Sequence, residues 1–170
     1  MKKFLLSLLF LCFILEPVLA GKKSKPERQD EDFLTMIMQA SFISMPDTLL
    51  PYLNRRTRNY LIELSKIGGY SYVDNNFGGK STLHILSPKH IQVFITDEVL
   101  CDMLIYKGGF LWITTMCSPE CYSRATLYSA KWEKIEDVLP PNDSVFVRSK
   151  IVNDSLLWVH GPIEEDELGH

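Results

Sequence analysis

The fold is decided by residues 90–117, HIQVFITDEVLCDMLIYKGGFLWITTMC. Three runs in this stretch are rich in β-branched and aromatic residues, which favour strands, and they span 90–96, 99–106 and 110–117. The short segments between them, Thr96-Asp-Glu98 and Lys107-Gly-Gly109, have the composition of hairpin turns. The stretch therefore predicts three neighbouring antiparallel strands.

The same pattern continues on both sides of this stretch. Further strands are predicted at 70–74, 81–86 and 121–128, and the short turns Ser87-Pro-Lys89 and Ser118-Pro-Glu120 connect them. We therefore expect an antiparallel meander. Weaker strand signals follow it at 132–135, 144–148 and 155–160.

Two amphipathic helices are predicted before the sheet. Apolar residues recur at spacings of three and four over 32–43, which predicts the first helix. Asn54 is a typical cap for the second, whose expected buried stripe is Thr57, Tyr60, Leu61, Leu64 and Ile67. The predicted fold class is α+β, with two N-terminal helices packed on one face of an antiparallel β-meander sheet.

Short turns also set the register of a meander, and the register assigns side chains to its two faces. Counting across the turns places partners opposite one another in the pairs Leu83 and Val93, Val93 and Cys101, Met103 and Ile113, and Ile113 and Ala125. These residues make one face aliphatic. We expect the helices to pack on that face.

The opposite face is predicted to be mixed, with polar side chains between aromatic ones. It carries the candidate binding residues His84, Gln92, Asp102, Trp112, Thr114, Tyr122 and Arg124. A mixed face of this kind suits a partner or ligand. The alternative is a structural face that is solvated or covered by the returning segment 132–160. The pattern is compatible with both.

Residues 1–20 have the three parts of a cleavable export signal. Lys2 and Lys3 precede the apolar run 4–15, and Val18-Leu-Ala20 is a small-residue cleavage site before Gly21. The run is shorter than the roughly 20 apolar residues of a membrane span, so we expect no transmembrane anchor after cleavage. The expected location is outside the cytoplasm, periplasmic or secreted in a bacterium.

The exported chain is predicted to have a flexible charged leader at 21–31, a single α+β domain at 32–163 and a frayed acidic tail at 164–170. Removal of residues 1–20 takes two lysines and one glutamate from 18 basic and 21 acidic residues, which leaves a net charge of −4. This acidic balance argues against nucleic acid as a partner. An envelope protein or a glycan is the expected kind of partner.

No stretch carries a specific catalytic, metal or cofactor motif. Phe77-Gly-Gly-Lys-Ser81 resembles the end of a phosphate-binding loop, but Asp74 stands where the first glycine is needed. His84, His90 and His160 lack the second closely spaced pair of ligands that a zinc site requires. We therefore expect no metal and no cofactor, and we assign no catalytic residue.

The cysteines of the exported chain are Cys101, Cys117 and Cys121. Cys117 and Cys121 would face each other across a three-residue turn, which favours a disulfide between them over a zinc site. Cys101 would then be a free thiol on the aliphatic face. A catalytic role for it is disfavoured, because a buried thiol is normally inert.

Three segments share the form Asp, hydroxyl residue, apolar residue: Asp47-Thr-Leu, Asp143-Ser-Val and Asp154-Ser-Leu. They resemble the acceptor motif of bacterial periplasmic O-glycosylation, which makes Thr48, Ser144 and Ser155 candidate modified residues. Asp-Ser and Asp-Thr pairs also occur as turns and helix caps.

Four segments occur in an order that resembles a family of small exported bacterial proteins, domain of unknown function 3256. They are MPDTLLPYL at 45–53, GGKS at 78–81, TTMCSP at 114–119 and LYSAKW at 127–132. The resemblance implies a cell-envelope protein and transfers no catalytic residue. We expect a binding or accessory protein without enzymatic activity, and the alternative is a small periplasmic hydrolase.

Overall fold

A computed structural model describes residues 25–67, 72–118, 120–141 and 147–160. The chain divides into two units between Glu31 and Asp32, and every strand belongs to the second unit. The predicted signal peptide, its cleavage site before Gly21 and the acidic tail lie outside the described residues.

Two helices precede the sheet, α2 (Lys25–Ser44) and α3 (Arg55–Ile67). Asn54 caps α3 as predicted, because its Oδ1 accepts a hydrogen bond of 3.0 Å from the backbone N–H of Thr57. Helix α2 begins earlier than expected, so the part of the charged leader from Lys25 to Glu31 is helical. Proline fits the first turn of a helix and the charged residues that follow are good helix formers, which explains the earlier start.

The buried side of α3 differs from the predicted stripe. Leu61 is buried as expected, but Tyr60 and Ile67 are 57% and 79% exposed, and Arg58 and Ile62 are buried instead. The helix is therefore rotated about its axis relative to the predicted orientation. A buried arginine in place of an apolar residue gives no apolar signal, which is why the pattern missed it.

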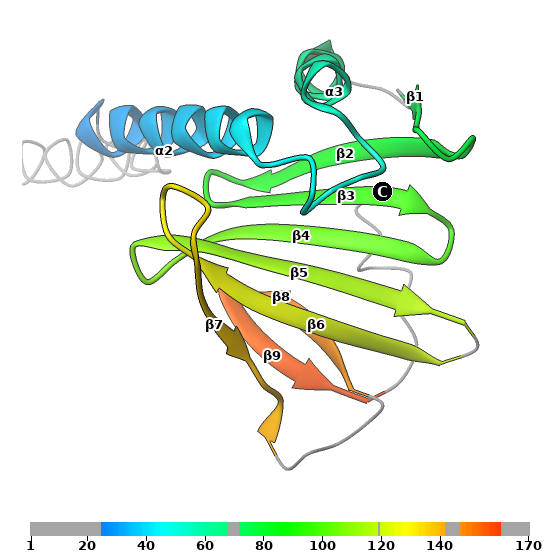
Figure 1. The fold of residues 1–170 in the computed structure, drawn as a ribbon. Helices are drawn as coiled ribbons and strands as arrows, with labels where there is room; N and C mark the ends of the chain where they lie inside the picture. The colour runs from blue at the N-terminus through cyan, green and yellow to red at the C-terminus, as the bar shows by residue number, and fades with distance from the viewer. Residues whose placement is uncertain (1–24, 68–71, 119, 142–146, 161–170) are drawn as a thin grey trace, which may run out of the picture. The chain divides into compact units, whose positions relative to one another are not determined.

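Seven antiparallel strands follow the helices and lie in the sheet in chain order (Figure 1). They are β1 (Val73–Asp74), β2 (Lys80–Ser87), β3 (His90–Thr96), β4 (Val99–Tyr106), β5 (Gly109–Cys117), β6 (Cys121–Tyr128) and β7 (Lys134–Val138). The predicted α+β class, two helices followed by an antiparallel meander, is confirmed.

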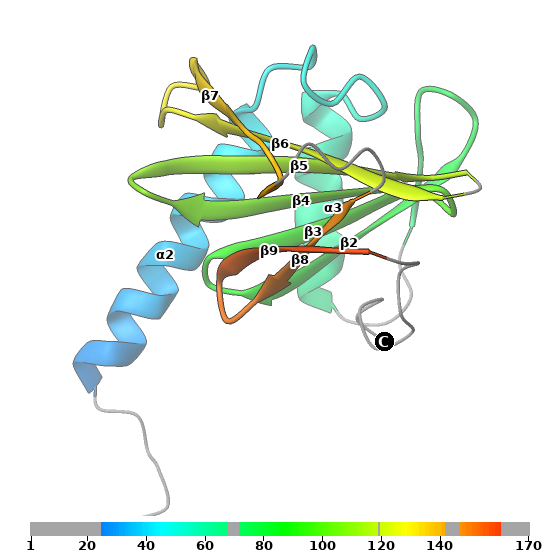
Figure 2. The ribbon, with the colours of Figure 1, turned by 90° about the horizontal axis from the view of Figure 1, so that it is seen from below.

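The returning chain forms a separate hairpin of β8 (Arg148–Val152) and β9 (Ser155–Val159). Its turn residues Asn153 and Asp154 have positive φ angles of 50° and 56°, as a two-residue hairpin turn requires. Figure 2 shows this hairpin on one side of the sheet and α3 on the other. The second face of the sheet is therefore covered in part by the returning chain.

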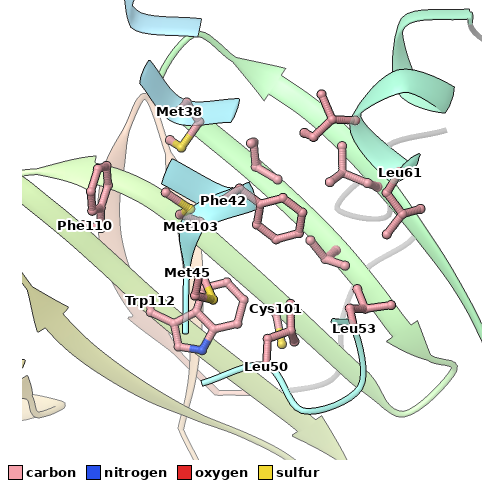
Figure 3. Packing of buried hydrophobic residues seen from close by; sticks show 14 of the residues in the cluster. Met38, Phe42, Met45, Leu50, Leu53, Leu61, Cys101, Met103, Phe110 and Trp112 are labelled. Atoms are coloured by element: carbon pink, nitrogen blue, oxygen red, sulfur yellow. The ribbon is translucent and has the colours of Figure 1, made fainter. Parts of the chain in front are cut away.

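Each face of the sheet has its own core. On the helix side, Met38 and Phe42 of α2 and Leu61 of α3 pack with Met103 and Trp112 of the sheet (Figure 3). On the hairpin side, a smaller cluster of sheet residues packs against three hairpin residues, Ile151, Leu156 and Trp158. The sheet residues of that cluster are Leu104, Leu111, Ile113 and Ala125. The sheet is thus buried on both sides over its central strands.

The predicted register is correct for three of the four strand pairs that we counted. Leu83 lies opposite Val93, Val93 opposite Cys101, and Ile113 opposite Ala125, but Met103 lies opposite Trp112 and not Ile113. The difference arises at the turn between β4 and β5, where Tyr106 pairs with Gly109. The turn therefore has two residues, Lys107 and Gly108, with φ angles of 48° and 77°.

One residue fewer in this turn exchanges the faces of every side chain in β5 and β6, because strand side chains alternate with a period of two. Ile113 and Ala125 consequently belong to the hairpin-side core, whereas Trp112 belongs to the core under the helices. Both hydrophobic sets are buried, so the apolar pattern is equally compatible with either register.

The predicted disulfide is present between Cys117 and Cys121, at the turn between β5 and β6, and Cys101 is free and buried. Across the described ranges, no helix combines the length and apolar character needed to cross a lipid bilayer.

Candidate functional site

The sheet does not bring the seven predicted binding residues together. His84, Gln92 and Asp102 are cross-strand neighbours on the hairpin side of β2, β3 and β4. On β5, however, the residue opposite Asp102 is Ile113 and not Thr114. The other four residues, Trp112, Thr114, Tyr122 and Arg124, lie on the opposite face because of the shorter β4–β5 turn. The proposed polar row across five strands is therefore wrong beyond Asp102.

The four displaced residues have different surroundings. Trp112 is 5% exposed and lies in the core under the helices. Thr114 pairs with Arg124 across β5 and β6, where Arg124 is exposed. Tyr122 is 40% exposed and its hydroxyl contacts the Met116 sulfur at 3.1 Å. These positions form no shared site.

A cavity of about 340 Å³ lies where the β8–β9 hairpin covers the sheet. Strands β2 to β5 contribute one wall, and the segment from Arg148 to Asp154 contributes the other. The sheet residues are Leu86, Ser87, His90, Gln92, Leu100, Asp102 and Thr115. Gln92 and Asp102 are thus the two predicted residues that line it, while His84 stands beside Gln92 outside the lining and contacts the Phe94 ring edge to face.

The centre of this cavity wall is a buried hydrogen-bond group of His90, Gln92 and Asp102. His90 Nε2 donates to Asp102 Oδ1 at 2.7 Å, and Gln92 Nε2 donates to the same oxygen at 3.3 Å. All three residues are at most 6% exposed. The carboxylate of Asp102 is therefore engaged by two donors from the neighbouring strand β3, which offsets the cost of burying it.

The carbonyl oxygen of the Gln92 amide has no hydrogen-bond partner. Gln92 Oε1 is buried and accepts no hydrogen bond, while the bond from Nε2 to Asp102 fixes the orientation of the amide. An unsatisfied buried acceptor costs about 1–3 kcal/mol. The Gln92 side chain lines the cavity, but its Oε1 atom is closed to solvent, so the missing hydrogen bond is a cost of packing and not an open ligand contact.

Hydroxyl groups hold the hairpin to the sheet beside this cavity. Thr115 Oγ1 and Ser123 Oγ are 2.7 Å apart, and Ser123 Oγ also accepts a hydrogen bond of 2.8 Å from Ser149 N. The backbone N–H of Ser123 donates to Val147 O at 3.0 Å. These contacts join β5, β6 and β8, and they keep the far wall of the cavity in place.

Charged side chains of both signs complete the lining. Arg148, 5% exposed, and Lys150 are basic, whereas Asp102 and Asp154 are acidic. Asp154 Oδ1 accepts a hydrogen bond of 2.9 Å from Ser87 Oγ, which joins the hairpin turn to β2. In the part of the chain that the structure describes, no group of three or more His, Cys, Asp and Glu side chains could hold a metal ion.

The free thiol is not a nucleophile for this cavity. Cys101 points to the helix-side core, and burial raises the pKa of its thiol to about 12. A thiol that stays protonated at neutral pH is unreactive. Cys101 therefore has a packing role.

Sequence reasoning selected Gln92 and Asp102 and missed the other lining residues, which are Leu86, Ser87, His90, Leu100 and Thr115 of the sheet and Arg148, Ser149, Lys150, Ile151, Asn153 and Asp154 of the hairpin. His90 and Gln92 alternate along one strand, so their shared face was available from the sequence. The hairpin residues carry no local signal for a site, since their place against the sheet depends on tertiary packing.

Two of the three candidate glycosylation residues are described. Thr48 and Ser155 are exposed, in the turn after α2 and at the start of β9, whereas Ser144 lies outside the described residues. Exposure is necessary for modification, and modification itself stays a prediction.

Comparisons with known proteins give a family and a fold. A family model described as "Protein of unknown function (DUF3256)" matches residues 33–158. A solved structure described as "Structure of a domain of an uncharacterized protein from Porphyromonas gingivalis W83" is similar with a TM-score of 0.56 and 17% identity, over 70% of this chain and 78% of that chain. At this identity the likeness shows the fold alone. No curated protein matches the sequence.

Proposed function

The chain belongs to the DUF3256 family, whose function is unknown, and we propose that it is an exported cell-envelope binding protein that holds a small polar ligand between the sheet and the β8–β9 hairpin. The proposed site is the cavity lined by His90, Gln92 and Asp102 on one side and by Arg148 to Asp154 on the other. It replaces the open aromatic surface that the sequence suggested.

The observation that carries the proposal is the cavity itself, whose wall holds the buried hydrogen-bond group of His90, Gln92 and Asp102. Its volume of about 340 Å³ is at the lower end of the size range of small-molecule sites, about 300–1,000 Å³. The two hydrogen bonds to Asp102 fix the orientation of the Gln92 amide and of the His90 ring. Polar groups held in place in this way can fix the orientation of a bound ligand.

The surroundings of the cavity suit binding more than chemistry. The lining is mostly polar, and Leu86, Leu100 and Ile151 are its apolar residues. A small-molecule site also needs polar groups that are held in place, and here the hydrogen bonds to Asp102 hold His90 and Gln92. Strand pairing and the hydroxyl contacts of Ser123 hold both walls. The site is therefore largely preformed, which lowers the entropy cost of binding.

Export rests on residues 1–20 and is tested by the N-terminus of the exported protein. N-terminal sequencing of material from the bacterial envelope or medium is expected to start at Gly21. The same sample serves for intact-mass measurement, in which a glycan on Thr48 or Ser155 would add mass. A chain that starts at Met1 would contradict export by this signal.

The experiment for the binding site uses two-dimensional amide NMR spectra of the exported chain with a library of small polar fragments. Binding fragments are expected to shift the amides of Gln92, Asp102 and Ser149. Gln92→Met should abolish these shifts and leave the protein folded, because the substitution keeps the side-chain volume and removes the polar amide from the cavity wall, while His90 still donates to Asp102. Arg124→Gln, on the opposite exposed surface, is the matched control and should bind as the original chain does.

A small hydrolase is the second candidate, favoured by the His90–Asp102 pair. An imidazole that is oriented by a carboxylate is a common general base in acyl transfer. Among the described residues, however, the hydrogen-bond partner of the His90 ring is Asp102, while the nearby hydroxyls of Thr115 and Ser123 bond to each other. Hydrolysis of p-nitrophenyl acetate and p-nitrophenyl glycosides should stay at the buffer rate. A rate that His90→Gln removes would favour the hydrolase.

A further inference from the structure

We infer that the disulfide between Cys117 and Cys121 is a redox-sensitive latch, which sets how often the start of β8 lifts from the sheet and opens the cavity. The part that concerns the cavity rests on the proposed function, since β8 is a wall of the same site. Three features of β5 and β6 support the latch, namely the face on which the disulfide lies, the contacts beside it and its exposure.

The disulfide lies on the hairpin side of the sheet. Cys117 and Cys121 are directly opposite one another, at the ends of β5 and β6 that meet at the turn. Thr115 and Ser123 form a pair two positions further along these strands, and side chains alternate with a period of two, so both pairs share one face. Thr115 lines the cavity, which identifies this face as the one under the hairpin.

The returning chain is attached at the neighbouring pair. Ser123 Oγ lies 2.7 Å from Thr115 Oγ1 and accepts hydrogen bonds from the backbone N–H of Ser149 at 2.8 Å and from its hydroxyl at 3.2 Å. The backbone N–H of Ser123 donates to Val147 O at 3.0 Å. All these contacts meet at one residue of β6, close to Cys121. Movement of this end of β6 would therefore break them together.

The disulfide is within reach of a reductant, and the free thiol is not. Cys117 and Cys121 are half-buried, and Ser118 and Glu120 of their turn are exposed. Cys101, in contrast, is buried in the helix-side core. Disulfides that solvent reaches are more readily reduced than buried ones. A dithiol in the surroundings of the protein can thus act on this bond, and Cys101 does not compete for it.

Reduction of the latch is a thiol–disulfide exchange. A thiolate of the dithiol attacks one sulfur of the Cys117–Cys121 bond, the S–S bond breaks, and the second thiol of the dithiol resolves the mixed disulfide. Both cysteines end as protonated thiols, and the dithiol is oxidised to its own disulfide. Two electrons and two protons have then passed to the protein.

Loss of the bond should release the end of the β5–β6 pair and not the whole fold. A disulfide contributes less to global stability when the loop that it closes is short, and Cys117 and Cys121 are four positions apart. The ends of elements open locally at a lower free energy than the whole domain. Without the bond this opening reaches Ser123 more often, and Val147 and Ser149 then lose their contacts with the sheet.

Amide hydrogen exchange measured by NMR tests the latch without any ligand. Reduction with dithiothreitol is expected to raise the exchange rates of the Ser123 and Ser149 amides about tenfold or more. The Ile91 amide, in the helix-side core, should exchange at the same rate in both states. Equal rates at Ser123 and Ser149 before and after reduction would overturn the inference. So would a bond that dithiothreitol does not reduce in the folded chain, or an equal loss of protection at Ile91.

Two variants separate the latch from other effects of the reductant. The chain with both Cys117→Ser and Cys121→Ser should exchange like the reduced chain and should not respond to dithiothreitol. Cys101→Ala is the matched control, and it should respond to dithiothreitol as the original chain does. A response that the double variant keeps, or that Cys101→Ala loses, would contradict the assignment to this disulfide.

The fragments that bind the cavity test the link to the site. A fragment enclosed by the hairpin leaves when the start of β8 lifts, so its dissociation rate should rise about tenfold on reduction, in proportion to the opening. An unchanged dissociation rate would overturn this link and leave the binding proposal intact. If no fragment binds in either state, the proposed function is wrong, whereas the exchange rates alone decide whether the disulfide holds the hairpin.

Discussion

Met103 lies directly opposite Trp112 in the antiparallel pair of β4 and β5, and both side chains are buried under the helices. This pairing determines which residues of β5 and β6 face the helices and which face the β8–β9 hairpin. It separates Trp112 from Gln92 and Asp102, so the cavity and the aromatic residues of β5 belong to different faces.

Trp112 should therefore behave as a core residue and not as a binding residue. Trp112→Ala is expected to lower the free energy of unfolding by about 3–5 kcal/mol, because a large buried side chain leaves a void. Urea denaturation followed by circular dichroism measures the loss. Tyr122→Ala, on the same face but 40% exposed, is the control and should cost much less. Equal stability of Trp112→Ala and the original chain would contradict the register.

Ile113→Asp tests the hairpin-side core. Ile113 is fully buried between the sheet and the residues Ile151, Leu156 and Trp158 of the hairpin. An aspartate there would be an unpaired buried carboxylate. The cost of burying such a group is comparable to the whole free energy of unfolding of a small domain, which is about 5–15 kcal/mol. The variant should lack a cooperative thermal transition. A variant that melts like the original chain would show that the hairpin does not cover this position.

Gly108 of the β4–β5 turn and Gly109 at the start of β5 should respond differently to alanine. Gly108 has a φ of +77° and open space around it, so Gly108→Ala should cost about 1–2 kcal/mol, the penalty of a left-handed backbone. A Cβ on Gly109 would lie 2.1 Å from the carbonyl oxygen of Tyr128, so Gly109→Ala should cost about 3 kcal/mol or more. Thermal melts of both variants measure the difference. The reverse order would indicate a three-residue turn.

Arg58 should be essential for joining the helices. Its guanidinium donates to the carbonyls of Leu53, Ile43 and Met45, and hydrogen bonds to charged groups contribute about 1.5–3 kcal/mol each. Arg58→Met should therefore lower the free energy of unfolding by more than about 3 kcal/mol. Asp47→Asn is the matched control.

The carboxylate of Asp47 also pairs with Arg58, at 2.9 Å, but the Asp47 side chain is 60% exposed. An exposed ion-pair partner contributes at most about 1 kcal/mol, so Asp47→Asn should be nearly as stable as the original chain. If the two variants are destabilised equally, the ion pair and not the carbonyl contacts stabilises the helix connection.

The cysteines should differ in reactivity. Iodoacetamide at pH 8 should leave Cys101 unmodified in the folded protein and modify it in urea, because burial raises its pKa from 9.0 to about 12. Non-reducing peptide mapping should recover Cys117 joined to Cys121. The raised pKa means that the folded state keeps a proton that the unfolded state releases, so this contribution to stability is complete below pH 9.0 and is lost as the pH approaches about 12. A bridge to Cys101 would contradict the structure.

Much of the fold could be predicted because its signals are local. Runs of β-branched and aromatic residues between short turns marked β2 to β6 almost to the residue, Asn54 marked the start of α3, and the short Cys117–Cys121 turn predicted the disulfide. Each of these signals depends on neighbours within a few residues. The candidate site was predicted only at Gln92 and Asp102, which share a face across one correctly counted turn.

The remaining features depend on contacts between distant segments. A sheet buried on both faces has apolar residues at successive positions, so Phe110, Leu111, Trp112 and Ile113 do not indicate which register of β4 and β5 is correct. The conformation of Lys107 and Gly108 selects that register. The position of the β8–β9 hairpin then follows from packing of Ile151 and Leu156 on the sheet, and only this packing brings Arg148 and Ser149 to the cavity with Gln92. Local residue patterns thus determine the strands, and tertiary contacts determine which faces meet, because burial and cavity formation are properties of surfaces that come together only in the folded chain.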